Sequence, residues 1–356
     1  MKAATKGATD AQVKSAAKDA TAPTKPAVKG AAPASPAVVR LVNLFKQGKT
    51  SGVLLALLLI MAIASIASPY FLSTFNMQSV IRAMAFTGMV AMAQACLLIL
   101  GELDLSVGAV AGLSGVLGGV FMVWLNIDPF VSFGLGLLSG AVFGLMNGLL
   151  VTWLELNALV VTIGMTGVYL GINLVISQGK AIIDIPPAIY FLGQGVVLGI
   201  PMPFVIMLLV LAVIVFVATY TPFGRYMYAI GNSREAAHIL GVPVNLVRTL
   251  TFMGVGLVAA LAGMVMVARL GTSQPSIGDT WVLDSIAASV IGGVALTGGV
   301  GSPAGALLGA AIIGVVQDVI VLFGVSPYYQ TAVSGMIVVG AIALDAISRK
   351  IARARQ

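Results

Sequence analysis

A polar stretch in an otherwise apolar chain holds the residues best suited to contact another molecule. Residues 223–248 contain three arginines, one glutamate and the only histidine, and the sequence on either side is apolar enough for lipid, so the stretch must lie in water. Asn232 or Ser233 can cap a helix there, because a short side-chain oxygen accepts hydrogen bonds from the free N–H groups of a first turn. Gly241 then supplies the stop. We therefore predict a short helix over about 234–240, outside the bilayer.

This helix would present small side chains to the water. Ala236 and Ala237 follow Glu235, and their size would let another protein approach the helix backbone closely. A solvated connecting loop explains the same polarity, so periodicity alone leaves both interpretations open. His238 is interpreted as an ordinary surface residue, because the sequence shows no catalytic constellation around it.

The order of these residues resembles the coupling-helix signature of permease subunits of ABC importers. In that family the helix sits in a groove of the ATP-binding subunit and passes its movement to the membrane spans. The resemblance implies that the residues in contact with an ATP-binding subunit are Gly231, Glu235, Ala236, Ala237 and Gly241. It also implies that this chain binds no cofactor itself, and that ATP and Mg bind to the partner ATPase subunit.

Two further motifs resemble the ribose/xylose/galactose branch of these permeases. One is the run Asp-Leu-Ser-Val-Gly at 104–108, and the other is Leu-Asp-Ser-Ile-Ala-Ala at 283–288, followed by Ile-Gly-Gly at 291–293. The resemblance extends over roughly residues 70–347. It implies a permease that forms the translocation path for a pentose or hexose in the bacterial inner membrane. A periplasmic sugar-binding protein and a second permease copy, as in a homodimer, are the further partners it implies.

Composition independently requires an integral membrane protein. Hydrophobic residues make up 59% of the 356 residues and charged residues only 9%, whereas a soluble domain has about 25% charged residues. The apolar runs are long and do not alternate with polar residues, which favours an all-α polytopic bundle over a β-barrel. Of the 19 Lys and Arg, 16 lie in residues 1–49, 222–249 and 349–356, so the positive-inside rule places both termini in the cytoplasm and argues against nucleic acid.

The chain is expected to divide into three parts. Residues 1–49 form a disordered basic cytoplasmic tail, residues 50–348 a transmembrane permease domain with a cytoplasmic coupling loop at 222–249, and residues 349–356 a second basic tail. An outer loop is expected over 178–199. About ten transmembrane helices are expected, over residues 51–68, 83–100, 106–125, 130–152, 158–177, 203–221, 250–268, 285–297, 305–323 and 331–347.

Glycines recur at intervals of four residues inside several of these spans. Gly140, Gly144 and Gly148 are one such series, and Gly167 and Gly171 are another. Lipid gives helices no hydrophobic reason to associate, so they depend on close backbone contact, which small residues at i and i+4 permit. We therefore expect these glycines to mark helix–helix contacts.

Polar residues in or beside the spans are the candidates for a translocation path. An ionisable group inside a span costs about 2.5–3.5 kcal/mol, so it indicates function or pairing. Glu102 and Asp104 lie between two spans, where they reach either an aqueous cavity or the cytoplasmic interface. The resembled permeases read Gly-Gly-Ile-Asp at this place, so the carboxylate at Glu102 is additional. The candidates are Gln94, Glu102, Asp104, Ser106, Asn147, Asn157, Asn173 and Asp318; the uncharged ones either line the path or bond helix to helix.

The sequence shows neither a phosphate-binding loop nor a metal-ligand pattern. Without a Gly-x-x-x-x-Gly-Lys-Ser/Thr run, the chain is expected not to be an enzyme, and ATP hydrolysis must come from a partner. Two alternatives stay open. One is an ion-coupled secondary transporter that uses Asp318 and Asp104, and the other is an ABC permease for a different small polar solute. The sequence does not name the sugar.

Overall fold

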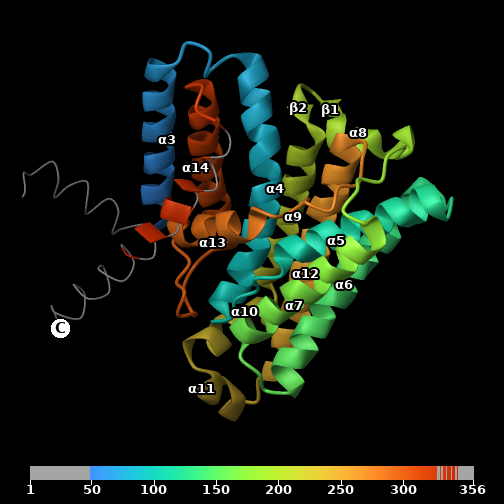
Figure 1. Cartoon of the computed structure of the whole chain (residues 1–356). Helices are drawn as coiled ribbons and strands as arrows, with labels where there is room; N and C mark the ends of the chain where they lie inside the picture. Colours follow the sequence, from blue (N-terminus) through green and yellow to red (C-terminus); the bar gives the residue numbers. More distant parts are fainter. Residues whose placement is uncertain are drawn as a thin grey trace, which may run out of the picture. The chain divides into compact units, whose positions relative to one another are not determined.

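The computed structural model describes residues 49–326 and scattered positions between 329 and 343 (Figure 1). The chain divides into the units Met1–Asn43 and Leu44–Gln356, and all described residues belong to the second. Apart from Lys49, the two expected tails lie outside the described residues, as does much of the expected span 331–347. The regular structure of the described part is helical except for one small hairpin of β1 (Val196–Val197) and β2 (Ile200–Pro201), which confirms the all-α class.

Seven helices of the described part are long and apolar enough to cross a membrane. Two further apolar helices are shorter, and the expected number of ten stays a prediction. The seven are α4 (Thr74–Ile99), α5 (Val107–Gly119) with its π-helical continuation η1 (Val120–Trp124), α6 (Pro129–Trp153), α7 (Ala158–Ser177), α9 (Met202–Tyr220), α12 (Val244–Leu270) and α14 (Pro303–Leu322). The shorter two are α3 (Lys49–Ala67), apolar from residue 52, and α13 (Trp281–Ile291).

Three helix boundaries differ from the expectation. α4 begins at Thr74 rather than at residue 83, because Ser73 caps it and the polar Asn76 finds a partner in Asp318. α12 begins at Val244 rather than at 250, because polar residues of its first turns are paired inside the protein. α13 spans 281–291 rather than 285–297, since the glycines that follow it end the helix.

The polar stretch at 223–248 contains two short helices rather than one. α10 (Pro222–Asn232) precedes α11 (Arg234–Ile239), and the extended Ser233 separates them. Ser233 caps α11 by accepting a hydrogen bond from the Ala236 N–H at 3.2 Å. At the other end Gly241 adopts φ +78°, and the N–H of Val242 donates to the carbonyl of Ala237 at 3.0 Å, which completes a Schellman motif. The short helix is therefore confirmed, whereas α10 is an addition.

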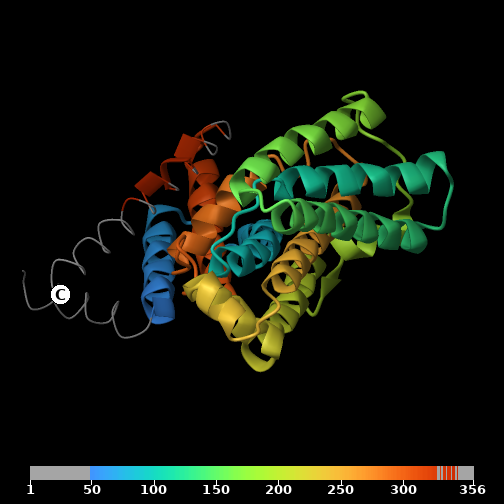
Figure 2. The same ribbon diagram turned by 90° about the horizontal axis from the view of Figure 1, so that it is seen from below.

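Helix α12 packs along α6 and also contacts α4, α5 and α10 (Figures 1 and 2). Gly140, Gly144 and Gly148 of α6 face α12, and a Cβ on Gly144 would overlap the backbone carbonyl of Phe252. The prediction that such glycines mark helix–helix contacts is thus confirmed for α6. It is wrong for Gly167 and Gly171 of α7, where an added Cβ would meet nothing within 4 Å. On the other side, α3, α14 and α4 lie side by side, and apolar residues of α3 and α14 share a second buried cluster with the start of α4 (Figure 1).

The segment between α7 and α9 is compact. It contains the short helices η2 (Pro187–Ile189) and α8 (Tyr190–Gln194) and then the hairpin of β1 and β2. Gln194 donates from Nε2 to the carbonyl of Arg269 at 3.0 Å, which ties α8 to the end of α12. The segment leads from one membrane helix to the next, as expected for the outer loop at 178–199.

Candidate functional site

A buried polar cluster surrounds Asp104 in the connection between α4 and α5. Its carboxylate Oδ1 accepts hydrogen bonds from the Ser106 N–H at 2.7 Å and from the Ser106 hydroxyl at 2.6 Å. Asn147 of α6 donates from Nδ2 to Ser106 Oγ at 2.8 Å and to Asp104 Oδ2 at 3.4 Å. The Tyr169 hydroxyl of α7 donates to Asn147 Oδ1 at 2.9 Å. We call these four residues the Asp104 cluster; it joins the connection to two membrane helices.

Helix α7 also holds the backbone of this connection in place. Thr162 accepts from the Leu105 N–H at 3.1 Å, and Thr166 donates to the Leu105 carbonyl at 3.1 Å. Burial raises the pKa of Asp104, and the hydrogen bonds from Ser106 and Asn147 oppose that rise. A buried acceptor that receives several hydrogen bonds fixes the local geometry, so the cluster defines one arrangement of α5, α6 and α7.

Two of the candidate path residues keep an unpaired acceptor. Gln94 donates from Nε2 to the Asp104 carbonyl at 3.2 Å, and Asn173 donates from Nδ2 to the Pro275 carbonyl at 3.0 Å. The amide oxygen of each is buried and has no hydrogen-bond partner among the described residues. An amide oxygen accepts hydrogen bonds from hydroxyl groups, so both side chains have capacity for a hydroxyl-rich solute or for water.

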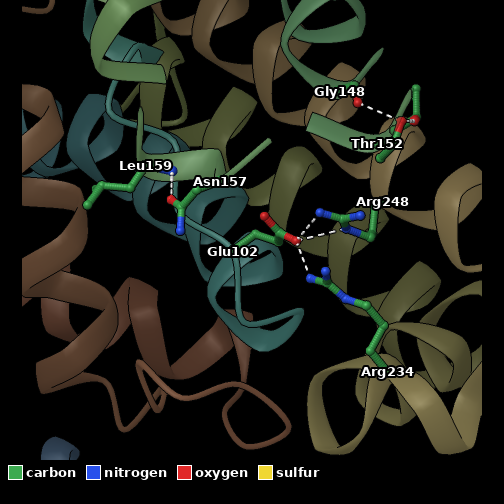
Figure 3. Close-up of polar contacts among 8 residues, drawn as sticks. Glu102, Gly148, Thr152, Asn157, Leu159, Arg234 and Arg248 are labelled. Carbon is green, nitrogen blue, oxygen red and sulfur yellow. Dashed lines mark hydrogen bonds and ion pairs between the residues drawn. The ribbon is translucent and has the colours of Figure 1, made fainter. Parts of the chain in front are cut away.

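Glu102 lies in a different environment, although it precedes Asp104 by only two residues. Its side chain is 5% exposed and forms ion pairs with Arg234 of α11 and Arg248 of α12, both at 2.6 Å (Figure 3). The structure therefore places Glu102 toward the segment that follows α10, and not in the Asp104 cluster. We call Glu102, Arg234 and Arg248 the Glu102 cluster.

The two remaining path candidates belong to neither cluster, although Asn157 lines a pocket together with Glu102, Arg234 and Arg248. Asn157 is exposed and caps α7 by accepting from the Leu159 N–H at 2.9 Å (Figure 3). Asp318 of α14 accepts from Asn76 Nδ2 at 2.8 Å, in the first turns of α4. Asp104 follows the last turn of the same helix, and a rise of 1.5 Å per residue separates the two ends by roughly 36 Å. Asp318 and Asp104 thus lie at opposite ends of α4.

The residues expected to contact an ATP-binding subunit divide into exposed and buried ones. Glu235 and Ala236 are exposed on α11. Ala237 is only 2% exposed and belongs to the main apolar core, so the structure corrects its expected place on the outer face of the helix. Gly231 packs internally as well, because a Cβ there would overlap the carbonyl of Ile99. Gly241 is open and ends α11.

Sequence reasoning missed two exposed apolar residues at the end of α11. Ile239 and Leu240 are 83% and 81% exposed, and Leu246 in the first turns of α12 is 57% exposed. A pocket of about 760 Å³ opens beside them, and its lining includes Glu155 and His238. Exposed large apolar side chains that gather at one place can form a contact surface. The signal was available in the sequence, because both large apolar residues lie at the end of the short helix that we predicted to lie outside the bilayer.

Comparison with known proteins agrees with this architecture. The family model for the branched-chain amino acid transport system / permease component matches residues 76–342, and the chain belongs to this family. It is 37% identical to the ribose import permease protein RbsC of Bacillus subtilis over 296 residues, which is 83% of this chain and 92% of that protein. It is 33% identical to the L-arabinose ABC transporter permease protein AraH of Azospirillum brasilense, over 85% and 89% of the two chains.

A third relative comes from another bacterium. The fructose import permease protein FrcC of Rhizobium meliloti is 34% identical, over 84% of this chain and 86% of that protein. No solved structure matches the chain. Family membership and the seven apolar helices identify a multi-pass protein of the bacterial inner membrane, and its relatives are transport components rather than enzymes.

Proposed function

We propose that the chain is the membrane permease subunit of an ATP-driven ABC importer and forms the translocation path for a monosaccharide. The observation that supports this most directly is its similarity, over more than four fifths of its length, to permeases named for ribose, arabinose and fructose. The sugar itself is a pentose or a hexose. The alternative of a different small polar solute is not favoured, because these relatives are all named for sugars.

The path passes beside the Asp104 cluster. The proposal is supported by the two buried amide oxygens of Gln94 and Asn173 and by the dense hydrogen bonding of Asn147 and Ser106. In this conformation these groups are enclosed. Transport then requires the helices around them to separate so that the solute's hydroxyl groups replace the internal hydrogen bonds. Such a change is a rigid-body movement of helices around a fixed site.

The ATP-binding subunit docks on α11. Its contact surface consists of Glu235, Ala236, Ile239 and Leu240, and we call it the docking surface. ATP and Mg bind to that subunit, and this chain contributes no ATPase site. This assignment is supported by the exposure of Ile239 and Leu240, which leaves apolar surface in water unless a partner covers it. A soluble periplasmic sugar-binding protein and a second copy of this chain complete the importer.

A secondary transporter driven by an ion gradient is disfavoured. It would need Asp104 and Asp318 in one site near the middle of the membrane, and the structure places them at opposite ends of α4. Each is also hydrogen-bonded to neighbours on its own side, Asp104 to Ser106 and Asp318 to Asn76. The names of the relatives point the same way, because they describe import permeases and ABC transporter permeases.

The test is a pull-down of the chain from its own membranes in mild detergent, with the bound proteins identified by mass spectrometry. We expect an ATPase subunit to co-purify with the wild type and to be lost from Leu240→Asp. The matched control is Leu198→Asp, because Leu198 is 97% exposed but lies on the hairpin between α7 and α9. Uptake of labelled ribose, arabinose, allose and fructose then identifies the sugar. A chain that purifies alone and transports solute without ATP would refute the proposal.

A further inference from the structure

One carboxylate oxygen joins three separate elements of the chain. Glu102 Oε1 accepts from Arg234 Nη2 at 2.6 Å and from Arg248 Nε at 2.8 Å, and it lies 2.6 Å from Arg248 Nη2 (Figure 3). Glu102 belongs to the connection after α4, Arg234 begins α11, and Arg248 lies in the second turn of α12. Among the hydrogen bonds and ion pairs of the described residues, the pair between Arg234 and Glu102 is the only side-chain link between α11 and the connection after α4.

The two arms of the Glu102 cluster differ in their exposure to water. The side chains of Glu102 and Arg248 are 5% and 6% exposed, whereas that of Arg234 is 52% exposed. Water screens the buried pair little, so that pair is a fixed anchor. The half-exposed arm to Arg234 is weaker and can break without leaving a charge buried and unpaired. The cluster thus combines a permanent pair with a releasable one.

The anchored carboxylate is close to the Asp104 cluster along the backbone. Only Leu103 separates Glu102 from Asp104, and the Glu102 N–H is itself fixed to the Leu97 carbonyl at 2.9 Å. A displacement of Glu102 therefore reaches Asp104 within two residues. Backbone contacts give α10 a second link to the same place, because Gly231 packs against Ile99 and the adjoining loop.

We propose that Glu102 is a positioning residue that couples α11 to the Asp104 cluster. The pair with Arg234 transmits the movement of the docked helix to the connection that holds Glu102 and Asp104, while the pair with Arg248 keeps the carboxylate paired when the bond to Arg234 breaks. This inference rests on the proposed function, since it assumes that α11 moves with an ATP-binding subunit. The competing interpretation is that the Glu102 cluster only stabilises the fold. That interpretation predicts loss of folded protein or of the complex, whereas a coupling role predicts an intact complex that hydrolyses ATP but imports less sugar for each ATP.

The experiment uses the complete complex that co-purifies with the ATP-binding subunit, reconstituted in liposomes with its binding protein. ATP hydrolysis is measured beside uptake of whichever labelled sugar the wild type transports best among ribose, arabinose, allose and fructose. For Arg234→Gln we expect an intact complex with ATP hydrolysis close to that of the wild type. Sugar imported per ATP should fall at least about fivefold, the lower end of usual couplings between sites. The control Arg225→Gln removes an exposed arginine of α10 and should change neither quantity.

A second pair of variants tests whether Arg234 acts through Glu102. The double variant Glu102→Gln/Arg234→Gln should import no less sugar per ATP than Glu102→Gln alone, because both remove the same interaction. Glu102→Gln leaves Arg248 buried without a counter-charge. If this variant does not fold for that reason, the test instead compares Arg234→Gln with Glu102→Asp. Glu102→Asp keeps the charge, and we expect it to import more sugar per ATP than Arg234→Gln.

Three results would overturn the inference. Arg234→Gln could keep the wild-type ratio of sugar to ATP, it could lose the ATP-binding subunit and so prove to be a docking contact, or its effect could add to that of Glu102→Gln. Failure of the proposed function looks different. There the wild-type chain itself would co-purify no ATP-binding subunit, and the inference would fall with it.

Discussion

The hydrogen bonds around Asp104 predict a clear difference between two substitutions of this residue. Asp104→Ala removes an acceptor for the Ser106 N–H, the Ser106 hydroxyl and Asn147 Nδ2. Leaving a buried donor without an acceptor costs about 1–3 kcal/mol. The three donors together give a loss of about 3–9 kcal/mol in the free energy of unfolding, as an upper range. Side-chain hydrogen bonds inside a membrane protein average only about 0.6 kcal/mol each, or about 2 kcal/mol for three, so we expect a loss of about 2–3 kcal/mol.

Asp104→Asn should be much milder. Its amide oxygen can accept both hydrogen bonds from Ser106, and only the third position changes, where an NH₂ group then faces Asn147 Nδ2. Rotation of the Asn147 amide relieves this donor–donor contact, because Tyr169 already has a second acceptor in the Phe143 carbonyl at 3.0 Å. We expect a loss of about 1 kcal/mol, the net value of one hydrogen bond.

The assay is thermal unfolding of the detergent-solubilised protein, followed by the monodisperse fraction in size-exclusion chromatography, beside sugar uptake in cells that express equal amounts. The expected order of midpoints is wild type, then Asp104→Asn, then Asp104→Ala at a clearly lower temperature. Equal losses in both variants would refute the reasoning. They would mean that the negative charge, and not the acceptor geometry, holds the connection.

Three further outcomes follow from the packing. Ala236→Trp should abolish co-purification of the ATPase while leaving the amount of folded protein unchanged, whereas Ala237→Trp should lower that amount, because Ala237 is buried in the core; equal expression levels would contradict this. Asp318→Asn should keep sugar uptake within about twofold of the wild-type rate, since its amide oxygen still accepts from Asn76. Abolished uptake would instead indicate that Asp318 belongs to the translocation path. Gly144→Leu should prevent folding, as judged by expression and chromatography, because its side chain has no room against α12; a stable monodisperse variant would disprove that close contact.

Much of the architecture follows from the sequence, because bilayer physics leaves few choices. A chain with 59% hydrophobic and 9% charged residues cannot cover a water-soluble surface, and lipid requires each span to satisfy its own backbone hydrogen bonds. Local signals were sufficient for α11, since Ser233 and Gly241 act within a few residues of their own positions. The boundaries of α4 and α12 were missed for the opposite reason. Their polar first turns are stabilised by partners far along the chain, Asp318 and Glu102.

The sequence by itself determined the membrane class, the family and the helix that faces the ATP-binding subunit in our proposal. Only the tertiary structure decided which partner each polar side chain takes. Glu102 meets arginines 132 and 146 residues further along the chain, and no local pattern contains that information. The orientation of α11 is similar. Helical periodicity tells which residues share a face, but packing of the whole protein decides that Ala237 turns inward while Ile239 and Leu240 stay exposed.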